Sequence, residues 1–349
     1  MENKKKKVFV AMSGGVDSSV AALLLAKQEY EVVGCHMLCW EGCENNVDKR
    51  DAMRVAAKLG IPFLTFDFRK EYRERVYDYM VSEYAAGRTP NPDVMCNKEI
   101  KFGIFLERAL ELGADYVATG HYVRKIGDKL FEAKDKNKDQ SYFLWATPKE
   151  KLQYCLFPIG DYLKSEVREI ARNAELPTAD KKDSQGLCFV GKTDFQKFLR
   201  EALPKKEGAI LSPAGEVLGR HDGAHFYTIG QRHGLKLGGQ DRPVYVAERN
   251  IHTNTLVVAG EKNRELYRSE VEVENLNLLG DLPKRVEVRI RYRQPRQGAR
   301  FSGGKIIFDE PQRGVAAGQS AVFYEAGDPS MSSGRNSLEF RMLGGGIMK

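Results

Sequence analysis

Between residues 8 and 122 the chain alternates short apolar runs with longer amphipathic stretches. The runs at 8–12, 31–37, 62–68 and 115–122 are rich in β-branched or aromatic residues and have the length of buried strands. Apolar residues at helical spacing predict helices from Val20, over 51–60, and from Arg69 to about Ala86. Strands that alternate with helices in this way are typical of a parallel sheet with crossover helices, so we expect an α/β fold.

Two later changes of pattern divide the rest of the chain. From Leu163 to Leu199 the spacing predicts two helices separated by a loop that contains DSQGLCFVG. After residue 203 short strands and Gly or Asn turns dominate, and a second change near 279–283 indicates two β modules rather than one. A chain of 349 residues is long enough for two or three domains. We therefore expect domains over 1–203, 204–277 and 278–349.

The composition is that of a soluble protein, with 42% hydrophobic and 30% charged residues. No apolar run approaches the length that spans a bilayer, and VFVAM at 8–12 is too short for a signal peptide. We expect a cytoplasmic protein with no membrane partner. In that reducing compartment, the six cysteines are better candidates for functional thiols than for structural disulfides. The net charge of +7 is compatible with a polyanionic partner without requiring one.

The first candidate for chemistry is SGGVDSS at 13–19, which lies between the first predicted strand and helix. Gly14 and Gly15 let the backbone approach a ligand, and serine hydroxyls with the free N–H groups at a helix start can donate to phosphate. A Walker A loop would need a lysine that is missing here. The pattern therefore favours a loop that grips the pyrophosphate of an ATP split between its α and β phosphates. An ordinary glycine turn with a serine cap is the alternative.

The SGGxDS motif is that of the PP-loop ATP pyrophosphatases, and the chain resembles the tRNA-specific 2-thiouridylase (MnmA) family within that class. The resemblance follows family order along nearly the whole chain. Its segments are TPNPDVMCNKEIKF (89–102), ATGHY (118–122), KDQSYFL (138–144), FPIGDYLKSEVREIA (157–171), DSQGLCFVG (183–191), YTIGQRHGL (227–235), RYRQP (291–295) and RGVAAGQSAVFY (313–324).

The resemblance implies a PP-loop domain with an adenine nucleotide α-hydrolase-like fold, followed by two small barrel-like β domains. It also implies ATP-dependent 2-thiolation of a tRNA uridine at wobble position 34, with Mg²⁺ accompanying ATP. The expected partners are tRNA and a protein that donates persulfide sulfur. By family position, the ATP contacts are Ala11, Met12, Ser13, Gly14, Gly15, Val16, Asp17, Ser18, Met37 and Gly120.

Two cysteines stand in matching motifs. Cys96 precedes a helical pattern and lies near two lysines, so we expect a helix N-terminal thiol with a depressed pKa. Cys188 is in a glycine-flanked loop, and for either cysteine the alternative is a small apolar filler. The resemblance implies that Cys188 carries a persulfide, that Cys96 resolves it, and that Asp93 acts as acid or base. Asp93 is otherwise a helix cap or turn carboxylate.

Other uses of the cysteines stay open. Asp93, Cys96 and Cys188 could instead supply three ligands to an iron–sulfur cluster, as in some relatives of this ATPase class. Cys35, Cys39 and Cys43 form a C-x3-C-x3-C run, which we interpret as two buried thiols and one in a loop rather than a metal site.

Contacts to tRNA are expected from the loop beside Cys96 and from the C-terminal part. Arg88 and Asn91 could hold a flipped base. In the arginine-rich stretch 288–300, strand alternation would place Arg289, Arg291 and Arg293 on one face as a phosphate-binding stripe, with a solvated face as the alternative. By family position, the tRNA contacts are Asn91, Pro92, Asp93, His121, Lys138, Asp139, Gln140, Arg291, Tyr292 and Gln319.

Two departures from the family pattern concern the C-terminal part. Gly298 and Ala299 stand where several relatives have a cysteine, and residues 330–341 form an insertion. Two other functions remain alternatives. One is a PP-loop ligase that amidates a small carboxylate, which would have no use for the cysteine pair. The other is a tRNA-binding protein without catalysis, which would be expected to have lost parts of SGGVDSS, Cys96 or Cys188.

Overall fold

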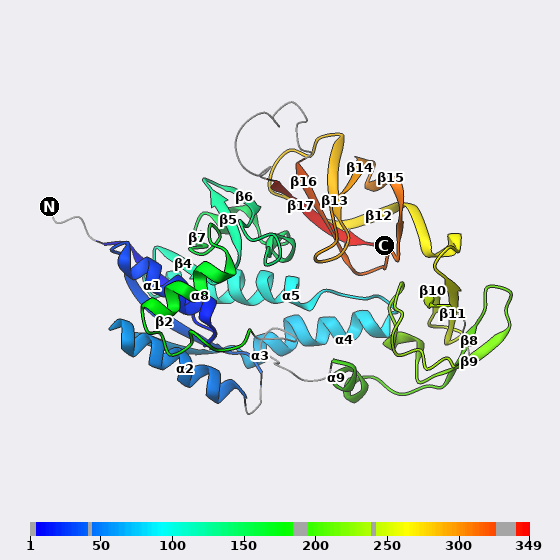
Figure 1. Ribbon diagram of the computed structural model, residues 1–349, viewed down its shortest axis with the longest axis horizontal. Coiled ribbons are helices and arrows are strands. Elements are labelled where there is room, and N and C mark those ends of the chain that lie inside the picture. The colour runs from blue at the N-terminus through cyan, green and yellow to red at the C-terminus, as the bar shows by residue number, and fades with distance from the viewer. Residues whose placement is uncertain (1–4, 41–43, 184–194, 239–241, 326–339) are drawn as a thin grey trace.

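The structure is a computed structural model that describes residues 5–40, 44–183, 195–238, 242–325 and 340–349. Cys43 and Cys188 lie outside these ranges. Three units follow one another along the chain: a parallel α/β unit and two β modules. In Figure 1 the central module lies beyond the right-hand end of α4, and the C-terminal module lies above α4 and α5. Among the described helices, none is long and apolar enough to cross a membrane.

The N-terminal unit is built on a five-stranded parallel sheet of order β3-β2-β1-β4-β7, which confirms the expected α/β fold. The strand order reverses between β1 and β4, and ligands of parallel sheets bind where the order reverses. The predicted strand at 115–122 is shorter, because it ends at Thr119. The strands are β1 (Lys7–Ala11), β2 (Glu31–Leu38), β3 (Phe63–Asp67), β4 (Tyr116–Thr119) and β7 (Cys155–Leu156).

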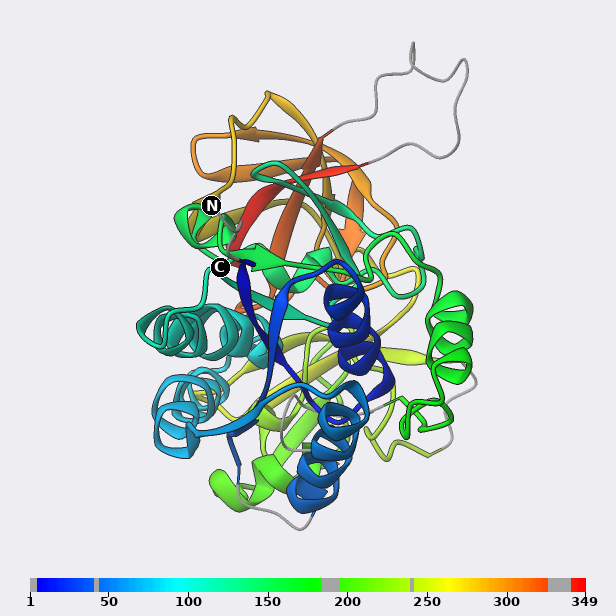
Figure 2. The same cartoon turned by 90° about the vertical axis from the view of Figure 1, so that its left-hand side faces the viewer.

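Helices cover both faces of this sheet (Figure 2). Val8 and Val10 of β1 pack with α1, α2 and α8, whereas Phe9 and Ala11 pack with the helices on the other face. A continuous helix runs from Arg69 to Ala85, as the sequence predicts. The helices of this unit are α1 (Val16–Lys27), α2 (Glu44–Leu59), α3 (Arg69–Tyr72), η1 (Arg73–Tyr77), α4 (Asp78–Ala85), α5 (Pro92–Met95), η2 (Cys96–Ile104), α6 (Phe105–Glu111), η3 (Ser141–Leu144), α7 (Lys149–Leu152), α8 (Lys164–Asn173) and α9 (Phe195–Ala202).

The central module is a four-stranded sheet of order β10-β11-β8-β9. Its apolar face packs against Met80 and Tyr84 of α4 and against α9, so this module shares a core with the N-terminal unit. Its elements are β8 (Gly208–Leu211), β9 (Val217–His221), η4 (Ala224–Phe226), β10 (Val244–Asn250), β11 (Thr255–Gly260) and, at its end, η5 (Arg264–Leu266).

The C-terminal module is a closed antiparallel barrel of order β12-β15-β14-β13-β16-β17, in which β17 pairs back to β12. A hairpin of the N-terminal unit extends it, because β6 pairs with β17. The hairpin therefore joins the first expected domain to the third. The strands are β5 (Val123–Ile126), β6 (Lys129–Glu132), β12 (Tyr267–Leu278), β13 (Arg285–Arg289), β14 (Gln297–Ser302), β15 (Lys305–Arg313), β16 (Ser320–Glu325) and β17 (Arg341–Met348).

Candidate nucleotide and thiol site

The SGGVDSS loop connects β1 to α1 at the point where the strand order reverses. Gly14 has φ +78°, and a Cβ on it would lie 2.2 Å from the carbonyl oxygen of Asp48. Only glycine fits there without displacing the start of α2. Gly15 caps α1 in an extended conformation, so the N–H groups of the first helical turn point out of the helix at this loop. The arrangement is that of an anion-binding helix N-terminus.

Gly120 brings the end of β4 against the same loop. A Cβ on Gly120 would lie 2.6 Å from Ser18 N and 2.7 Å from Asp17 C, both backbone atoms of the first turn of α1. Among the other predicted ATP contacts, Ser13 is exposed, Gly15 and Asp17 are partly exposed, and Ala11, Met12, Gly14, Val16, Ser18 and Met37 are buried.

A network of charges that the sequence reasoning missed surrounds the loop. Lys164 Nζ lies 2.6 Å from Asp17 Oδ1 and 2.9 Å from Asp183 Oδ1. Arg168 and Lys138 also pair with Asp183, at 2.7 and 2.6 Å. Although burial opposes it, the hydrogen bonds from Lys138 and Lys164 lower the pKa of Asp183 to about 2. Lys164 and Arg168 are four residues apart in KSEVR and therefore share one face of α8. This spacing was the signal in the sequence that could have revealed the network.

A second lysine, Lys181, also contacts the loop. Lys181 Nζ donates to the carbonyl oxygen of Gly14 at 3.0 Å and pairs with Asp48 and Asp51 at 2.7 and 2.6 Å. Burial opposes ionisation, yet the two carboxylates raise the pKa of Lys181, so its charge persists at neutral pH. The nucleotide loop is therefore contacted by two lysines, Lys181 at Gly14 and Lys164 at Asp17.

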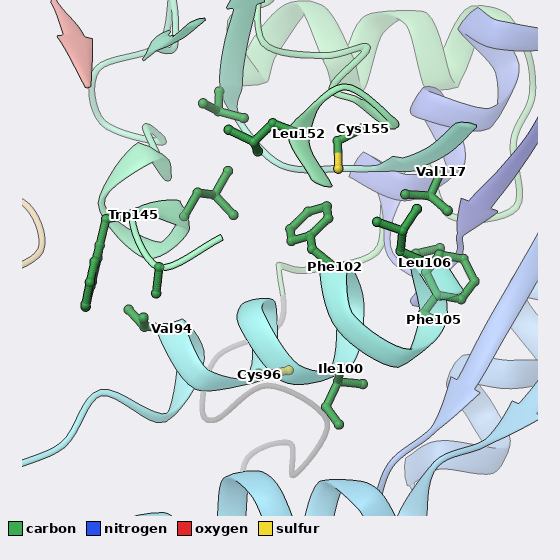
Figure 3. Packing of buried hydrophobic residues seen from close by; sticks show 14 of the residues in the cluster. Val94, Cys96, Ile100, Phe102, Phe105, Leu106, Val117, Trp145, Leu152 and Cys155 are labelled. Atoms are coloured by element: carbon green, nitrogen blue, oxygen red, sulfur yellow. The ribbon is translucent and has the colours of Figure 1, made fainter. Parts of the chain in front are cut away.

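Cys96 lies more than one turn inside a helix, which corrects the expectation of a thiol in a loop at a helix start. The helix begins earlier because the side chain of Asn91 accepts from Val94 N at 3.4 Å and Pro92 occupies the first turn. The Cys96 side chain is buried in the same core as Ile100 and Phe102 (Figure 3). Asp93, one turn earlier, is partly exposed.

The residues after β4 connect the nucleotide loop to the Cys96 helix. Tyr122 donates its hydroxyl hydrogen to Asp17 Oδ1 at 2.8 Å. His121 packs on the other side, with its ring 5.9 Å from that of Phe102 and its Nε2 3.5 Å from Lys101 Nζ. Burial and then the Lys101 charge lower the pKa of His121 well below its usual value, so the imidazole is neutral at neutral pH.

The predicted contacts in KDQ have partners inside the protein. Lys138 pairs with Asp183, as above, and Gln140 accepts from Tyr122 N at 2.9 Å. Asp139 is 3% exposed and pairs with Arg289 of the barrel at 3.0 Å. KDQ thus connects the charge network, the end of β4 and the barrel.

The predicted arginine stripe on a strand face is wrong. β13 ends at Arg289, and the chain turns at Arg293, which has φ +63°. Arg289 is 9% exposed and bound to buried carboxylates, while Arg291 donates to the carbonyl oxygens of Arg313 and Gly314, the latter at 2.9 Å. Alternation cannot continue through a turn, so these side chains share no face.

Of two other predicted tRNA contacts, Gln319 reaches the segment before the Cys96 helix, and Tyr292 is connected to the helix itself through Phe143. Gln319 donates its amide hydrogens to the carbonyl oxygens of Thr89 at 3.0 Å and Pro90 at 3.4 Å. Tyr292 packs on Phe143 with ring centroids 4.5 Å apart, and the Phe143 carbonyl oxygen accepts from Asn97 of the Cys96 helix. By contrast, Arg88 pairs with Glu83 and with Glu274 of the barrel.

The comparisons with known proteins agree along the whole chain. Sequence models of a tRNA methyl transferase HUP domain, a tRNA methyl transferase PRC-barrel domain and an aminomethyltransferase β-barrel domain match residues 6–192, 196–260 and 268–335. The tRNA-specific 2-thiouridylase MnmA 2 of Geobacillus kaustophilus is 45% identical over 96% of this chain and 95% of its own. MnmA of Bacillus subtilis is 47% identical over 91% of this chain and 92% of its own.

The chain belongs to the tRNA-specific 2-thiouridylase (MnmA) family. Among solved structures, the U34-tRNA thiolase NcsA from Methanococcus maripaludis with its [4Fe-4S] cluster matches with a TM-score of 0.36, at 20% identity over 56% of this chain and 63% of that one. A likeness so slight does not align the two chains residue by residue.

The remaining cysteines of this MnmA-family chain are buried where the structure describes them. Cys35 on β2 and Cys39 just after it are 0% and 1% exposed, and burial raises the pKa of Cys35. Within the described ranges, no group of three or more His, Cys, Asp or Glu side chains is placed to hold a metal ion. The raised pKa of Cys35 and the burial of both thiols favour the structural interpretation of Cys35 and Cys39.

Proposed function

We propose that this MnmA-family protein catalyses ATP-dependent 2-thiolation of uridine at wobble position 34 of tRNA. The chain matches relatives named tRNA-specific 2-thiouridylase over nearly their whole length. The observation that carries the proposal is the path Gly120–Tyr122, which contacts the nucleotide loop on one side and the Cys96 helix on the other. A base activated by ATP at the loop would be within reach of groups on that helix.

The first step is adenylation of the base. The O2 oxygen of uridine attacks the α-phosphorus of ATP, pyrophosphate leaves, and the oxygen becomes part of an AMP leaving group. The N–H groups at the start of α1 would bind the phosphates, and Lys164 and Lys181 would balance their charge. By family position, the residues from Ala11 to Ser18, with Met37 and Gly120, enclose the nucleotide.

Magnesium fits the donor set beside this loop. Mg²⁺ is commonly bound by one or two carboxylates together with substrate phosphates, and Asp17 and Asp183 both lie within 3 Å of Lys164 Nζ beside the loop. These two carboxylates would hold the ion, which supplies positive charge to the phosphate oxygens. Lys164 holds their negative charges together in the absence of the ion.

The second step transfers sulfur. The terminal sulfur of a Cys188 persulfide attacks C2 of the adenylated base, and AMP leaves with the original oxygen. The Cys96 thiolate then attacks Cys188 Sγ, the sulfur–sulfur bond breaks, and its electron pair stays on the sulfur that is now on the base. A Cys96–Cys188 disulfide remains and needs a two-electron reductant. Asp93 would accept and return the proton of the base.

The tRNA contacts are proposed from family position. Asn91, Pro92 and Asp93 would meet the target base, because they start the helix that carries Cys96. Gln319 donates to the carbonyl oxygens of Thr89 and Pro90 just before that segment, and Tyr292 packs on Phe143, whose carbonyl oxygen accepts from Asn97 of the same helix. The other predicted tRNA contacts have side chains that are bound within the protein, so they would support the tRNA-binding segment without touching the base. They are His121, Lys138, Asp139, Gln140 and Arg291.

Sulfur would arrive from a donor protein that carries a persulfide. The use of Asp93, Cys96 and Cys188 as three ligands of an iron–sulfur cluster is the competing route. Iron analysis and absorption spectra of protein purified without oxygen distinguish the two, because a cluster route requires stoichiometric iron and the persulfide route requires none.

The test is mass spectrometry of unmodified tRNA after incubation with the protein, ATP, Mg²⁺ and a persulfide source, with AMP measured in parallel. We expect one sulfur at one uridine per AMP, and no sulfur from Cys188→Ser. Thiolation by a Cys96→Ser, Cys188→Ser double variant would contradict the persulfide scheme. AMP formed on a small carboxylate and not on tRNA would favour a ligase, and bound tRNA with neither product would favour a non-catalytic protein.

A further inference from the structure

The residues that lead into the Cys96 helix are held by all three parts of the protein. We call residues 87–92 the entry segment. It follows α4 of the N-terminal unit and ends with the cap and first turn of α5. Its outer contacts come from the central module on one side and the barrel on the other.

On the central side the contact is Arg249, at the end of β10. Its guanidinium donates to the carbonyl oxygens of Gly87 and Tyr227, and lies 3.5 Å from the hydroxyl of Thr89. Gly87 has φ +75°, and a Cβ on it would lie 2.3 Å from Ile251. The entry segment therefore fits closely against β10.

On the barrel side the contacts are made before β16. Thr89 N donates to the carbonyl oxygen of Ala317 at 2.8 Å, and Gln319 donates to the carbonyl oxygens of Thr89 and Pro90. A Cβ on Gly318 would lie 2.8 Å from Thr89 N. The barrel thus holds the backbone of the entry segment directly.

Arg249 is unusual among these contacts because it is a charge bound to neutral acceptors. Its acceptors are backbone carbonyl oxygens from two different units, and burial lowers the pKa of its guanidinium. Burying a charge without a carboxylate adds little stability, but the rigid donor fork fixes the relative position of two carbonyl groups. Such a residue is better suited to fixing the position of the two backbone segments than to stabilising the fold.

We propose that Arg249 is a positioning residue, which holds the entry segment so that Asn91 caps the helix and Asp93 and Cys96 face the target base. Gln319 holds the same segment from the barrel, through the carbonyl oxygens of Thr89 and Pro90. The roles of Asp93 and Cys96 rest on the proposed function. Arg249 itself touches neither nucleotide nor base.

The first arm of the test measures access to the buried thiol and needs no reaction. Wild-type protein and Arg249→Met are treated with iodoacetamide, and the labelling rates of Cys96 and Cys155 are read by peptide mass spectrometry. Both cysteines are 0% exposed, and Cys155 lies on β7, where it pairs with Val117 of the parallel sheet. We expect Cys96 to label about tenfold faster in the variant, with Cys155 unchanged. The proposal would be overturned if both cysteines were labelled faster to the same extent, or if the labelling rate of Cys96 did not change.

Arg268→Met is the matched control. Arg268 lines the same cavity of about 150 Å³ as Arg249, but it is exposed and, among the residues that the structure describes, donates to the carbonyl oxygens of its neighbours Glu265 and Tyr267. Its labelling rates should equal those of wild type. Arg249→Lys provides a second variant if the methionine fails to fold, and should give an intermediate Cys96 rate, because one ammonium group cannot replace a donor fork.

The second arm separates binding from chemistry. With tRNA, Arg249→Met should keep the dissociation constant within about threefold of wild type and lower the rate of thiolation at saturating tRNA at least tenfold. A variant that weakens tRNA binding with an unchanged maximal rate would mean that Arg249 contacts RNA. If wild-type protein thiolates no tRNA, the proposed function fails, whereas the ratio of Cys96 to Cys155 labelling still decides the positioning role.

Discussion

Replacing Gly120 with alanine tests whether the end of β4 sets the position of the nucleotide loop. The backbone at Gly120 is not left-handed, so alanine can adopt its conformation. The new Cβ, however, would lie 2.6 Å from Ser18 N and 2.7 Å from Asp17 C. Both atoms are backbone, so no side-chain rotation relieves the contact.

The size of the effect follows from these distances. Ordinary contact begins at 3.4 Å, so the loop or the strand must retreat by about 0.8 Å from the observed 2.6 Å. Overpacking of this kind costs about 1–3 kcal/mol. A displacement near 1 Å at a reacting group lowers rates about 10²-fold. We therefore expect tRNA-dependent AMP formation to fall about 10- to 100-fold, with a melting temperature lower by only a few degrees.

The assay is AMP release with saturating tRNA and varied ATP, with tRNA affinity measured separately and expected to be unchanged. Gly260→Ala is the control, because a Cβ at the end of β11 would meet no described atom within 4 Å. Wild-type kinetics for ATP in Gly120→Ala would refute the reasoning, since the loop would then tolerate the displacement or lie elsewhere when nucleotide is bound.

Four further outcomes are expected. Lys164→Met should raise KM for ATP about tenfold in the AMP assay, whereas Lys134→Met, which loses only an exposed ion pair, should match wild type. Cys96→Ser should form AMP but no thiouridine, and thiouridine by mass spectrometry would contradict its role. Arg289→Met should lower the free energy of unfolding in urea by about 3–5 kcal/mol, because it leaves buried carboxylates short of a partner, and a loss below 1 kcal/mol would refute this. Asp183 has a folded pKa of about 2, below its unfolded value of 3.8, so it stabilises the fold above about pH 4. The stability deficit of Asp183→Asn, roughly 1 kcal/mol at pH 7 after allowance for exposure, should shrink as the pH falls from 4 towards 2.

The features that the sequence predicted well depend on local pattern. Apolar runs and helical spacing are visible within a dozen residues, so the parallel sheet and the helix from Arg69 to Ala85 were accessible. The position of SGGVDSS after the first strand was accessible for the same reason. The hairpin over 123–132 was missed although Gly127 marks a turn between two alternating runs. Its pairing with β17 joins residues more than 200 positions apart, which no local pattern shows.

The sequence analysis placed the start of the Cys96 helix one turn too late, although the signal for the true start was present. Asn91 followed by Pro92 is a typical helix cap and first residue, and these two residues put the helix start before Cys96. The consequence is chemical, since a thiol inside the second turn is buried rather than presented at a helix end. Access to Cys96 therefore depends on what holds the helix start in place.

Arginines were the least predictable residues, because their partners are distant in sequence. Arg289 binds Asp139, Arg249 binds the carbonyl of Gly87, and Arg291 binds the carbonyl of Gly314. Two of these three contacts cross between units. In all three, the guanidinium N–H groups are already bound within the protein, although the net charge alone would suggest that they bind phosphate. The net charge of +7 counts these internal arginines, so it overestimates the positive charge that is exposed to RNA. Because buried charges fix geometry more than they add stability, such arginines are expected at junctions between units that must hold one arrangement. The tRNA surface should therefore be sought among exposed basic residues, and the buried arginines tested for their effect on the rate of the reaction.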